Sequence, residues 1–277
     1  MYRFGRVAVL AGLVLLLSGF GSSEIMFKSL SVAGQGDGAE IPAVLGRPEG
    51  AGPFPAVVMI PGCGGLNPEL RTDWAPALAA AGYVTIALEN IRSRGMAHCL
   101  SRGPSGRPFA SWIGDAYGAL DWLSRQPYVD VGRVAVMGFS NGGIILSRYM
   151  AEDLATPAGH RFRAMISVYA HCNGDTRPGG PPVSGTPRVP WLVLNGGEER
   201  WEMKGPCGQL KGRTNVSVEL IEGAHHGWDA KRFTTPRSDP AGNVMLYSEE
   251  ATRKSHDIVR EFLAQNMKDQ APPAAAR

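Results

Sequence analysis

The feature of this sequence that most constrains its fold is the alternation of short strand-like runs with segments of helical character. Runs that predict strands, most of them apolar, occupy residues 56–60, 83–88, 133–138, 164–170, 191–195 and 217–222. Segments that predict helices occupy residues 72–81, 109–126, 141–151 and 247–266. Apolar strands are typical of a parallel sheet with helices on both faces, because right-handed crossovers place the helices there. We therefore expect an α/β fold around a mostly parallel sheet of about eight strands.

An N-terminal hairpin and a single large domain complete the expected architecture. Residues 25–32 and 40–47 flank a glycine-rich connection, which predicts an antiparallel pair of strands. The chain has 277 residues, of which 44% are hydrophobic, and α/β units of this size often fold as one domain. We expect that domain over residues 24–268 and a disordered tail over residues 269–277.

Residues 1–23 have the order of regions found in a secretory signal peptide. Arg3 and Arg6 precede an apolar run at residues 7–17, and small residues follow at 18–23. The apolar run has 11 residues, which is short for a helix that must span about 30 Å of hydrocarbon. We expect cleavage and export to the periplasm or the medium, without stable membrane association. The alternative is an uncleaved anchor.

A Gly-x-Ser-x-Gly motif lies where a predicted strand passes into a predicted helix. Residues 138–143 read Gly-Phe-Ser-Asn-Gly-Gly. In this context the motif is typical of a nucleophile elbow, a strained turn whose glycines relieve crowding. Ser140 is therefore the predicted nucleophile. The backbone N–H of Asn141, at the start of the helix, is a predicted donor to the oxyanion that forms during attack.

A second oxyanion donor is expected from the glycine-rich turn at residues 61–65, which reads Pro-Gly-Cys-Gly-Gly. The turn follows the strand at 56–60, and its glycines let the backbone approach a ligand closely. The candidate donor is the N–H of Cys63. A phosphate-binding loop is not indicated, because no Gly-Lys-Ser/Thr follows the turn.

A base and an orienting acid are expected from the loops after the last two strands. His226 lies in the segment Ala-His-His-Gly-Trp-Asp, where a glycine and an aromatic residue follow it. Glu199 follows the preceding strand and would fix the tautomer of the imidazole. His225 is an alternative base, and Glu198 and Asp229 are alternative acids. The expected order along the chain is nucleophile, acid, base.

Together these segments resemble the dienelactone hydrolase family of α/β-hydrolases over about three quarters of the chain. The likeness rests on residues 57–65, 138–143, 196–199 and 224–229. The resemblance implies the roles already assigned to Ser140, Glu199, His226, Cys63 and Asn141.

Three positions depart from the pattern of that family. Namesake members use a cysteine nucleophile, whereas Ser140 is similar to the broader esterase-type relatives. Those relatives commonly carry His at the position of Pro61 and Asp at the position of Glu199.

The predicted activity is hydrolysis of a carboxylic ester or a lactone through an acyl-enzyme, with no cofactor and no metal required. The expected partner is the small-molecule substrate. Nucleic acid is not expected, because 28 basic and 25 acidic residues give a net charge of +3 without a long run of one sign. The alternatives are a peptidase or polyester hydrolase on the same fold, an inactive small-molecule binding protein, and a zinc enzyme that uses His98 and His171.

Export bears on the four cysteines, because disulfides persist in oxidising compartments. Four thiols allow three pairings. Cys172 and Cys207 follow neighbouring predicted strands and form the preferred disulfide. Cys63 and Cys99 are then the second pair.

Four further side chains are candidates for the wall of the substrate crevice. Arg92 and Arg94 follow the strand at 83–88, so either could clamp a substrate carboxylate; the alternative is that they lie in water or pair with an acid. Trp201 and Trp228 flank the acid and the base. They either form apolar walls or only pack the loops.

Overall fold

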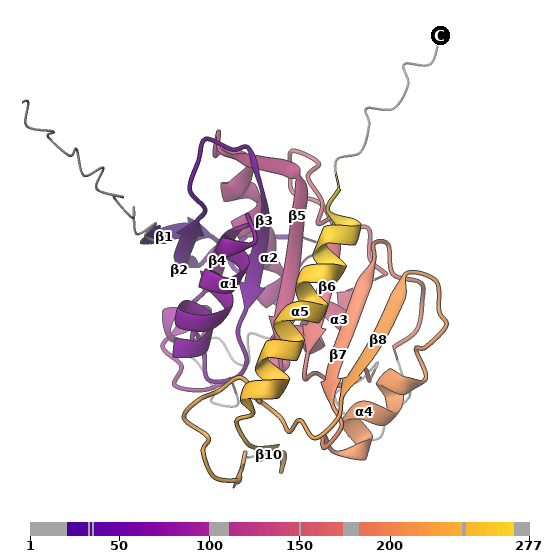
Figure 1. The fold of residues 1–277 in the computed structure, drawn as a ribbon. Helices are drawn as coiled ribbons and strands as arrows, with labels where there is room; N and C mark the ends of the chain where they lie inside the picture. Colours follow the sequence, from indigo (N-terminus) through magenta and orange to yellow (C-terminus); the bar gives the residue numbers. More distant parts are fainter. Residues whose placement is uncertain are drawn as a thin grey trace, which may run out of the picture.

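The computed structural model of the chain describes residues 21–32, 34, 36–99, 111–149, 151–173, 183–239 and 242–268, with the backbone alone at 201–203. Within these residues the main sheet has eight strands in the order β1-β2-β4-β3-β5-β6-β7-β8 (Figure 1). The strands are β1 (Gly21–Lys28), β2 (Glu40–Arg47), β3 (Phe54–Ile60), β4 (Val84–Leu88), β5 (Val129–Phe139), β6 (Ala164–Val168), β7 (Trp191–Gly196) and β8 (Val216–Ile221). Strands β3 to β8 run parallel, and β1 and β2 are antiparallel to their neighbours. The predicted mostly parallel sheet with an N-terminal hairpin is confirmed.

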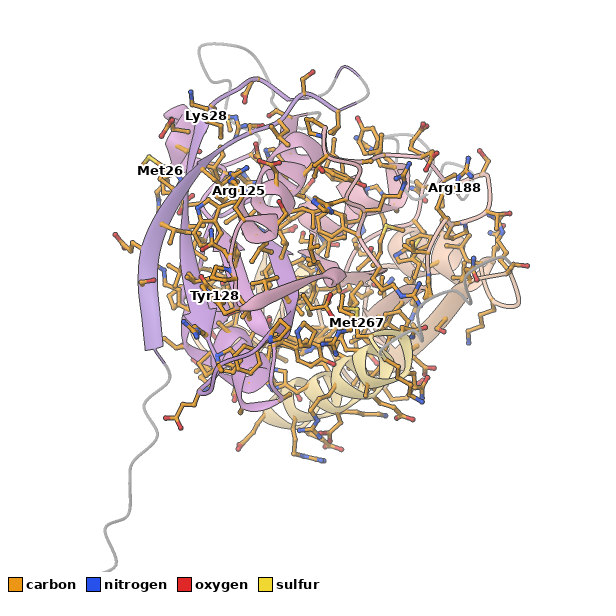
Figure 2. All side chains as sticks on the ribbon, turned by 90° about the horizontal axis from the view of Figure 1, so that it is seen from above. Met26, Lys28, Arg125, Tyr128, Arg188 and Met267 are labelled. Atoms are coloured by element: carbon orange, nitrogen blue, oxygen red, sulfur yellow. A yellow bond between two sulfur atoms is a disulfide. The ribbon has the colours of Figure 1, made fainter. Side chains whose placement is uncertain are left out.

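Helices cover both faces of the sheet, as predicted. The helical elements are the π-helix η1 (Leu70–Trp74), α1 (Ala75–Ala80), the 3-10 helix η2 (Arg92–Arg94), α2 (Ser111–Ser124), α3 (Asn141–Tyr149), α4 (Trp201–Gly208) and α5 (Glu249–Asn266). Helices α2 and α3 lie on one face, and α1 and α5 lie on the other (Figures 1 and 2). Strand β3 shows why: Val58 and Ile60 belong to the core with α2 and α3, whereas Val57 and Met59 belong to the core with α1 and α5. Apolar residues at successive positions therefore fill both layers.

The first strand lies four residues earlier than the predicted strand at 25–32. Residues 29–32 leave the sheet and approach α2, where the Leu30 N–H donates to the Gly114 carbonyl over 3.0 Å. Gly114 permits this approach, because a Cβ atom there would lie 2.4 Å from the Leu30 oxygen. Packing on a helix thus ends the strand where periodicity alone would continue it.

Helix boundaries follow local caps. The predicted helix at 72–81 forms as η1 and α1, and it begins at Leu70, whose N–H donates to the Asn67 side chain over 3.0 Å. Helix α5 begins two residues later than predicted, because the Ser248 hydroxyl caps it by accepting from the Ala251 N–H.

The predicted signal peptide and the tail at 269–277 lie almost entirely outside the described residues. Among the described helices, none combines the length and the apolar character that a membrane span requires.

The carboxyl ends of the parallel strands meet at one edge of the sheet, where the predicted site segments follow β3, β5, β7 and β8. A small two-stranded sheet, β9 (Arg237–Ser238) with β10 (Val244–Met245), lies at the same end of the molecule (Figure 1). It is joined to the loop after β8 by a bridge between His226 and Met245. Ligands of open α/β sheets bind at this edge.

Two disulfides are present, Cys63–Cys99 and Cys172–Cys207. Both predicted pairings are confirmed. Disulfides form and persist in oxidising surroundings, so they indicate an oxidising compartment for this protein.

Candidate active site

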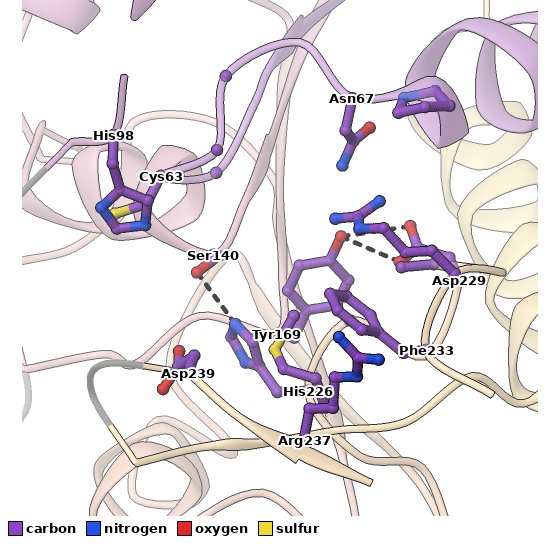
Figure 3. Close-up of a pocket in the computed structure, with 18 of the residues that line it drawn as sticks. Cys63, Asn67, His98, Ser140, Tyr169, His226, Asp229, Phe233, Arg237 and Asp239 are labelled. Carbon is purple, nitrogen blue, oxygen red and sulfur yellow. Dashed lines mark hydrogen bonds between the residues drawn. The ribbon is translucent and has the colours of Figure 1, made fainter. Parts of the chain in front are cut away.

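Ser140 occupies a strained turn between β5 and α3. Its φ is 50°, a left-handed conformation that non-glycine residues rarely adopt. The turn is possible because of its glycines: a Cβ atom at Gly138 would lie 2.4 Å from the Gly142 backbone, and one at Gly142 would lie 2.4 Å from the Ile60 oxygen. The Gly-x-Ser-x-Gly spacing therefore reflects close approach of β5, α3 and β3. The turn points the serine side chain into a pocket at the carboxyl edge of the sheet (Figure 3).

The structure brings Ser140, His226 and Glu199 into one hydrogen-bonded series. His226 Nε2 lies 3.1 Å from Ser140 Oγ (Figure 3), and His226 Nδ1 lies 3.3 and 3.2 Å from the two carboxylate oxygens of Glu199. With the ring proton on Nδ1, the imidazole donates to Glu199 and accepts from the serine hydroxyl. His226 and Glu199 are both buried. This arrangement can remove the serine proton and stabilise the imidazolium that results.

Close packing of two turns places Glu199 against His226. The turn after β7 bonds to the loop after β8, through Gly197 N–H to Ile221 O over 2.7 Å and Glu198 N–H to Ala224 O over 3.0 Å. A Cβ atom at Gly196 would lie 2.1 Å from the Ala224 oxygen, so only glycine permits this contact. The Gly-x-x-Glu spacing from Gly196 to Glu199 has its physical basis here.

Electrostatics favour the protonated form of His226. Burial lowers the pKa of His226, but the Glu199 carboxylate, together with Asp239 and Asp229, raises it, and the pKa lies above its ordinary value. The Tyr169 ring also lies edge-on to the imidazole, with 5.0 Å between ring centroids. The ring is therefore held both by its hydrogen bonds and by packing.

The alternative acids and the alternative base are not part of this hydrogen-bonded series. Glu198 is exposed. Asp229 is buried and accepts from Trp74 Nε1 over 2.7 Å and from the Tyr169 hydroxyl over 3.2 Å. His225 is half-buried, and its Nδ1 is buried without a hydrogen-bond partner among the described residues. In the geometry of the site, Glu199 and His226 are the pair that reaches Ser140.

The two predicted oxyanion donors flank the serine. Asn141 is the first residue of α3, directly after Ser140, and its side-chain Nδ2 donates to Cys63 Sγ over 2.6 Å. The turn at residues 61–65 comes close on the other side, since a Cβ atom at Gly62 would lie 3.2 Å from Ser140 Cβ. Both backbone segments therefore lie beside the place where a substrate carbonyl would meet Ser140.

The pocket has a volume of about 510 Å³ and a mixed polar and apolar lining. Arg92 lines it, as predicted, and its guanidinium is exposed and 3.5 Å from Glu89. Trp228 is fully buried against Tyr169 and is absent from the described lining, so it packs the loop and forms no wall. Trp201 is the first residue of α4, and its side chain lies outside the described part of the structure.

Arg94 is not a substrate clamp, and this prediction was wrong. Its side chain is only 5% exposed. The guanidinium bonds to both carboxylate oxygens of Asp115 over 2.7 and 2.9 Å, to Asp37 over 2.8 and 2.9 Å, and to the Asn90 carbonyl over 3.0 Å. Because acids of the protein satisfy this fork, no donor remains for a ligand.

Among the described residues, the two Ala-His-Cys tripeptides, at residues 97–99 and 170–172, do not assemble a set of zinc ligands. Cys63, His98 and Cys99 place their ligand-type atoms within 4.8 Å of one another, but the two sulfurs are joined in a disulfide and offer no thiolate. Cys172 is likewise in a disulfide. His98 lines the pocket, and His171 is not among the described residues that do so.

Several pocket residues were not found from the sequence. They are Met245 and, labelled in Figure 3, Asn67, Tyr169, Phe233, Arg237 and Asp239, all on the pocket lining. Tyr169 directly follows β6, so the rule that led to the other strand ends could have found it. The residues between 233 and 245 belong to the β9–β10 segment, whose two-residue strands leave no periodic pattern.

Comparison with known proteins places this geometry in a family. A search of curated proteins found no match. Among solved structures, the chain is similar to a dienelactone hydrolase from Anabaena variabilis, with a TM-score of 0.61, 18% identity, and coverage of 89% of this chain and 99% of that one. It is similar to a dienelactone hydrolase-like promiscuous phosphotriesterase from metagenomic libraries, with a TM-score of 0.59, 18% identity, and coverage of 90% and 100%. It is also similar to an acylaminoacyl peptidase from Pyrococcus horikoshii, with a TM-score of 0.58, 15% identity, and coverage of 94% of this chain and 43% of that one.

At these identities the likeness shows the fold, and the predicted α/β-hydrolase fold of the dienelactone hydrolase type is confirmed. A sequence model of the family described as X-Pro dipeptidyl-peptidase (S15 family) matches residues 37–183, more than half of the chain. That family is itself one of α/β-hydrolases. The chain therefore belongs to the X-Pro dipeptidyl-peptidase (S15) family and is a hydrolase with a dienelactone hydrolase-like fold.

Proposed function

We propose that this protein is a serine hydrolase that cleaves a carboxylic ester or a lactone through an acyl-enzyme. The observation that carries the proposal is the series from Ser140 Oγ to His226 Nε2, 3.1 Å apart, and from His226 Nδ1 to the Glu199 carboxylate, 3.2 Å apart. A serine in a pocket at the carboxyl edge of a parallel sheet, hydrogen-bonded to a buried imidazole and carboxylate, is what acyl transfer requires. No metal or cofactor takes part in the proposed steps.

In the proposed reaction, Ser140 Oγ attacks the carbonyl carbon while His226 Nε2 accepts the hydroxyl proton. The carbonyl oxygen becomes an oxyanion and accepts hydrogen bonds from the N–H groups of Cys63 and Asn141. When the intermediate collapses, the C–O bond to the leaving group breaks, and His226 gives its proton to the departing oxygen. Water then attacks the acyl-enzyme with His226 as base, which releases the acid and restores Ser140.

The lengths of the similar proteins support an ester or a lactone as the substrate, rather than a peptide. The chain covers 99% of the dienelactone hydrolase from Anabaena variabilis but 43% of the acylaminoacyl peptidase. The second candidate is a peptidase that cleaves after an X-Pro dipeptide, which the family assignment favours. Arg92, at the rim of the pocket, is our proposed contact for a negatively charged group of the substrate.

Hydrolysis of p-nitrophenyl acetate and butyrate tests the proposal. We expect the parent protein to turn over both esters and Ser140→Ala to lose at least about 10³-fold in kcat, because members of such a triad act as a unit. Ser124→Ala, at the end of α2, is the matched control and should keep full activity. Retention of turnover by Ser140→Ala would exclude Ser140 as the nucleophile.

Two further measurements separate the alternatives. A fluorophosphonate probe should label Ser140, whereas a protein that only binds ligands would not react. A higher kcat/KM on Ala-Pro-p-nitroanilide than on the esters would assign the protein to the peptidase activity.

We also propose that the signal peptide predicted at residues 1–23 directs export and that cleavage removes most of it. The two disulfides support an oxidising destination. N-terminal sequencing of the exported protein gives the cleavage point. Gly21 to Ser23 pair with Arg47 to Leu45 in the hairpin, so we expect cleavage at or before Gly21, which keeps β1 whole.

A further inference from the structure

The Cys63–Cys99 disulfide lies in the wall of the pocket that contains Ser140. Cys63 lines the pocket, as does His98, the neighbour of Cys99, and the two lie side by side near Ser140 (Figure 3). Cys99 itself is buried at the end of the segment that follows η2. The disulfide thus joins the turn after β3 to the segment after β4, and both segments contribute to one wall.

The turn that carries Cys63 has few constraints of its own. Three of its five residues are glycines, and a Cβ atom at Gly64 would meet nothing within 4 Å. Gly65 has a φ of 73°, and its N–H donates to the Gly62 carbonyl over 3.1 Å. Glycine loses more conformational freedom on ordering than any other residue, so such a turn samples many conformations unless other contacts hold it.

Three contacts converge on Cys63 and supply that restraint. Its sulfur is bonded to Cys99, the Cys99 N–H donates to the Cys63 carbonyl over 3.0 Å, and Asn141 Nδ2 donates to Cys63 Sγ over 2.6 Å. The carbonyl and the side chain of Cys63 are therefore both fixed. Because Gly62 lies against Ser140, fixing Cys63 also fixes the direction of its N–H relative to the serine hydroxyl.

We propose that the Cys63–Cys99 disulfide is a positioning device, which holds the Cys63 N–H where it donates to the oxyanion. The inference rests on the proposed function, because it assigns a role within the same reaction. A donor of this kind accelerates reaction only when it is already in place, and loss of one donor typically lowers kcat by about 10²- to 10³-fold. The oxyanion forms only in the transition state, so loosening the donor lowers kcat and leaves KM unchanged.

The second disulfide provides a matched control. Cys172–Cys207 closes a loop of 35 residues and Cys63–Cys99 one of 36, so removing either changes the entropy of the unfolded chain by nearly the same amount. Cys172 and Cys207 are fully buried and do not line the described pocket. The two double variants C63S/C99S and C172S/C207S therefore share a loss of stability but differ at the site.

The test compares kcat and KM of the parent and both double variants on p-nitrophenyl butyrate, well below their unfolding temperatures. We expect C63S/C99S to lose about 10- to 100-fold in kcat with KM within about twofold, and C172S/C207S to stay within about twofold of the parent in both. Affinity for a boronic acid, which mimics the tetrahedral intermediate, should fall in C63S/C99S by the same factor as kcat. An unchanged kcat in folded C63S/C99S, or an equal loss in both variants, overturns the proposal.

Reduction of the folded parent protein gives a second measurement that needs no variant to fold. Each tris(2-carboxyethyl)phosphine molecule transfers two electrons to one S–S bond, yielding two thiols and a phosphine oxide whose oxygen comes from water. Alkylation and mass spectrometry monitor the opening of Cys63–Cys99, and we expect kcat to fall in proportion to the fraction of opened bonds. A kcat that stays constant as this bond opens overturns the proposal. Failure of the proposed function gives a different result, since the parent would then hydrolyse no ester and its Ser140 would not react with the fluorophosphonate.

Discussion

At the scale of single residues, the position of Glu199 determines the behaviour of His226. The carboxylate lies 3.2 Å from Nδ1, and both groups are buried. A charge that is excluded from water acts strongly on its neighbour, so Glu199 is the largest of the contributions that raise the pKa of His226 against the effect of burial. The Glu199 carboxylate reaches His226 because Gly196 lets the turn after β7 lie directly against the loop that carries His226.

Replacing Glu199 with Gln should shift the pH dependence of activity to lower pH. Acyl transfer needs a neutral imidazole, and removal of the carboxylate lowers the pKa of His226, so His226 stays neutral in more acidic solution. We expect the acid limb of kcat/KM to move down and the plateau to fall by about 10²- to 10⁴-fold, because Gln also holds the imidazole tautomer poorly. The profile of kcat/KM from pH 5 to 9 measures both. Glu198→Gln, an exposed neighbour, should leave the profile unchanged, and an upward shift in Glu199→Gln would contradict the assignment.

The sequence predicted which residues meet at the ends of the strands, but it did not predict contacts that depend on the direction of a side chain. Ser140, Glu199 and His226 follow strands whose carboxyl ends share an edge, so their proximity could be inferred from chain order. Arg92 and Arg94 look equivalent in sequence, yet one lies at the rim and the other is buried among acids. Side chains two positions apart on a short 3-10 helix point in different directions, and no local pattern in the sequence indicates which of them faces the pocket.

At the scale of elements, Arg94 connects three segments that the sheet does not join. Its guanidinium holds Asp37 in the connection between β1 and β2, Asp115 in α2, and the Asn90 carbonyl after β4. Asp115 is fully buried, and burial raises its pKa to about 6 although Arg94 opposes this. No pattern in the sequence linked Arg94 with Asp115, because Asp115 is a single polar residue on the otherwise mostly apolar buried face of α2.

Arg94→Ala should be strongly destabilising. The substitution leaves the Asp115 carboxylate buried without its partner, and breaking one side of a buried ion pair typically costs about 3–5 kcal/mol in the free energy of unfolding. Urea denaturation at pH 8 measures it. Arg92→Ala, which removes an exposed guanidinium, should change the free energy of unfolding by less than about 0.5 kcal/mol. Similar effects for the two variants would show that the buried network contributes little.

At the scale of the whole molecule, Asp229 joins distant parts of the chain at the wall of the pocket. It accepts from Trp74, 155 residues earlier in η1, and from Tyr169, 60 residues earlier after β6. Burial raises the pKa of Asp229 to about 6, against the effect of the Trp74 hydrogen bond. The alternation of strands and helices predicted the layers around this contact, because apolar strands require cover on both faces. It could not predict the contact itself, which depends on two polar atoms meeting inside the finished fold.

The titration of Asp229 should make stability depend on pH. The pKa in the folded protein, about 6, exceeds the usual unfolded value of about 3.9, so the contribution of this group is full below about pH 4 and is lost as pH rises through about 6. Asp229→Asn cannot titrate. The free energy of unfolding of the variant relative to the parent should therefore rise by about 2–3 kcal/mol between pH 4 and pH 7. Urea denaturation across this range measures the difference.

Ser124→Ala, at the end of α2, removes no titratable group; it is the control and should show a difference that does not vary with pH. A constant difference for Asp229→Asn would mean that Asp229 titrates alike in the folded and unfolded chains.

The order of the strands also determines when the proposed chemistry can begin during synthesis. Ser140 is translated 86 residues before His226, and His226 is held in turn by the Val244 carbonyl through its own N–H over 3.1 Å. A nascent chain that has emerged only as far as α4 carries the serine and Glu199 but lacks the imidazole. The proposed triad, with the Val244 carbonyl that holds His226, is therefore complete only after nearly nine tenths of the chain has been made.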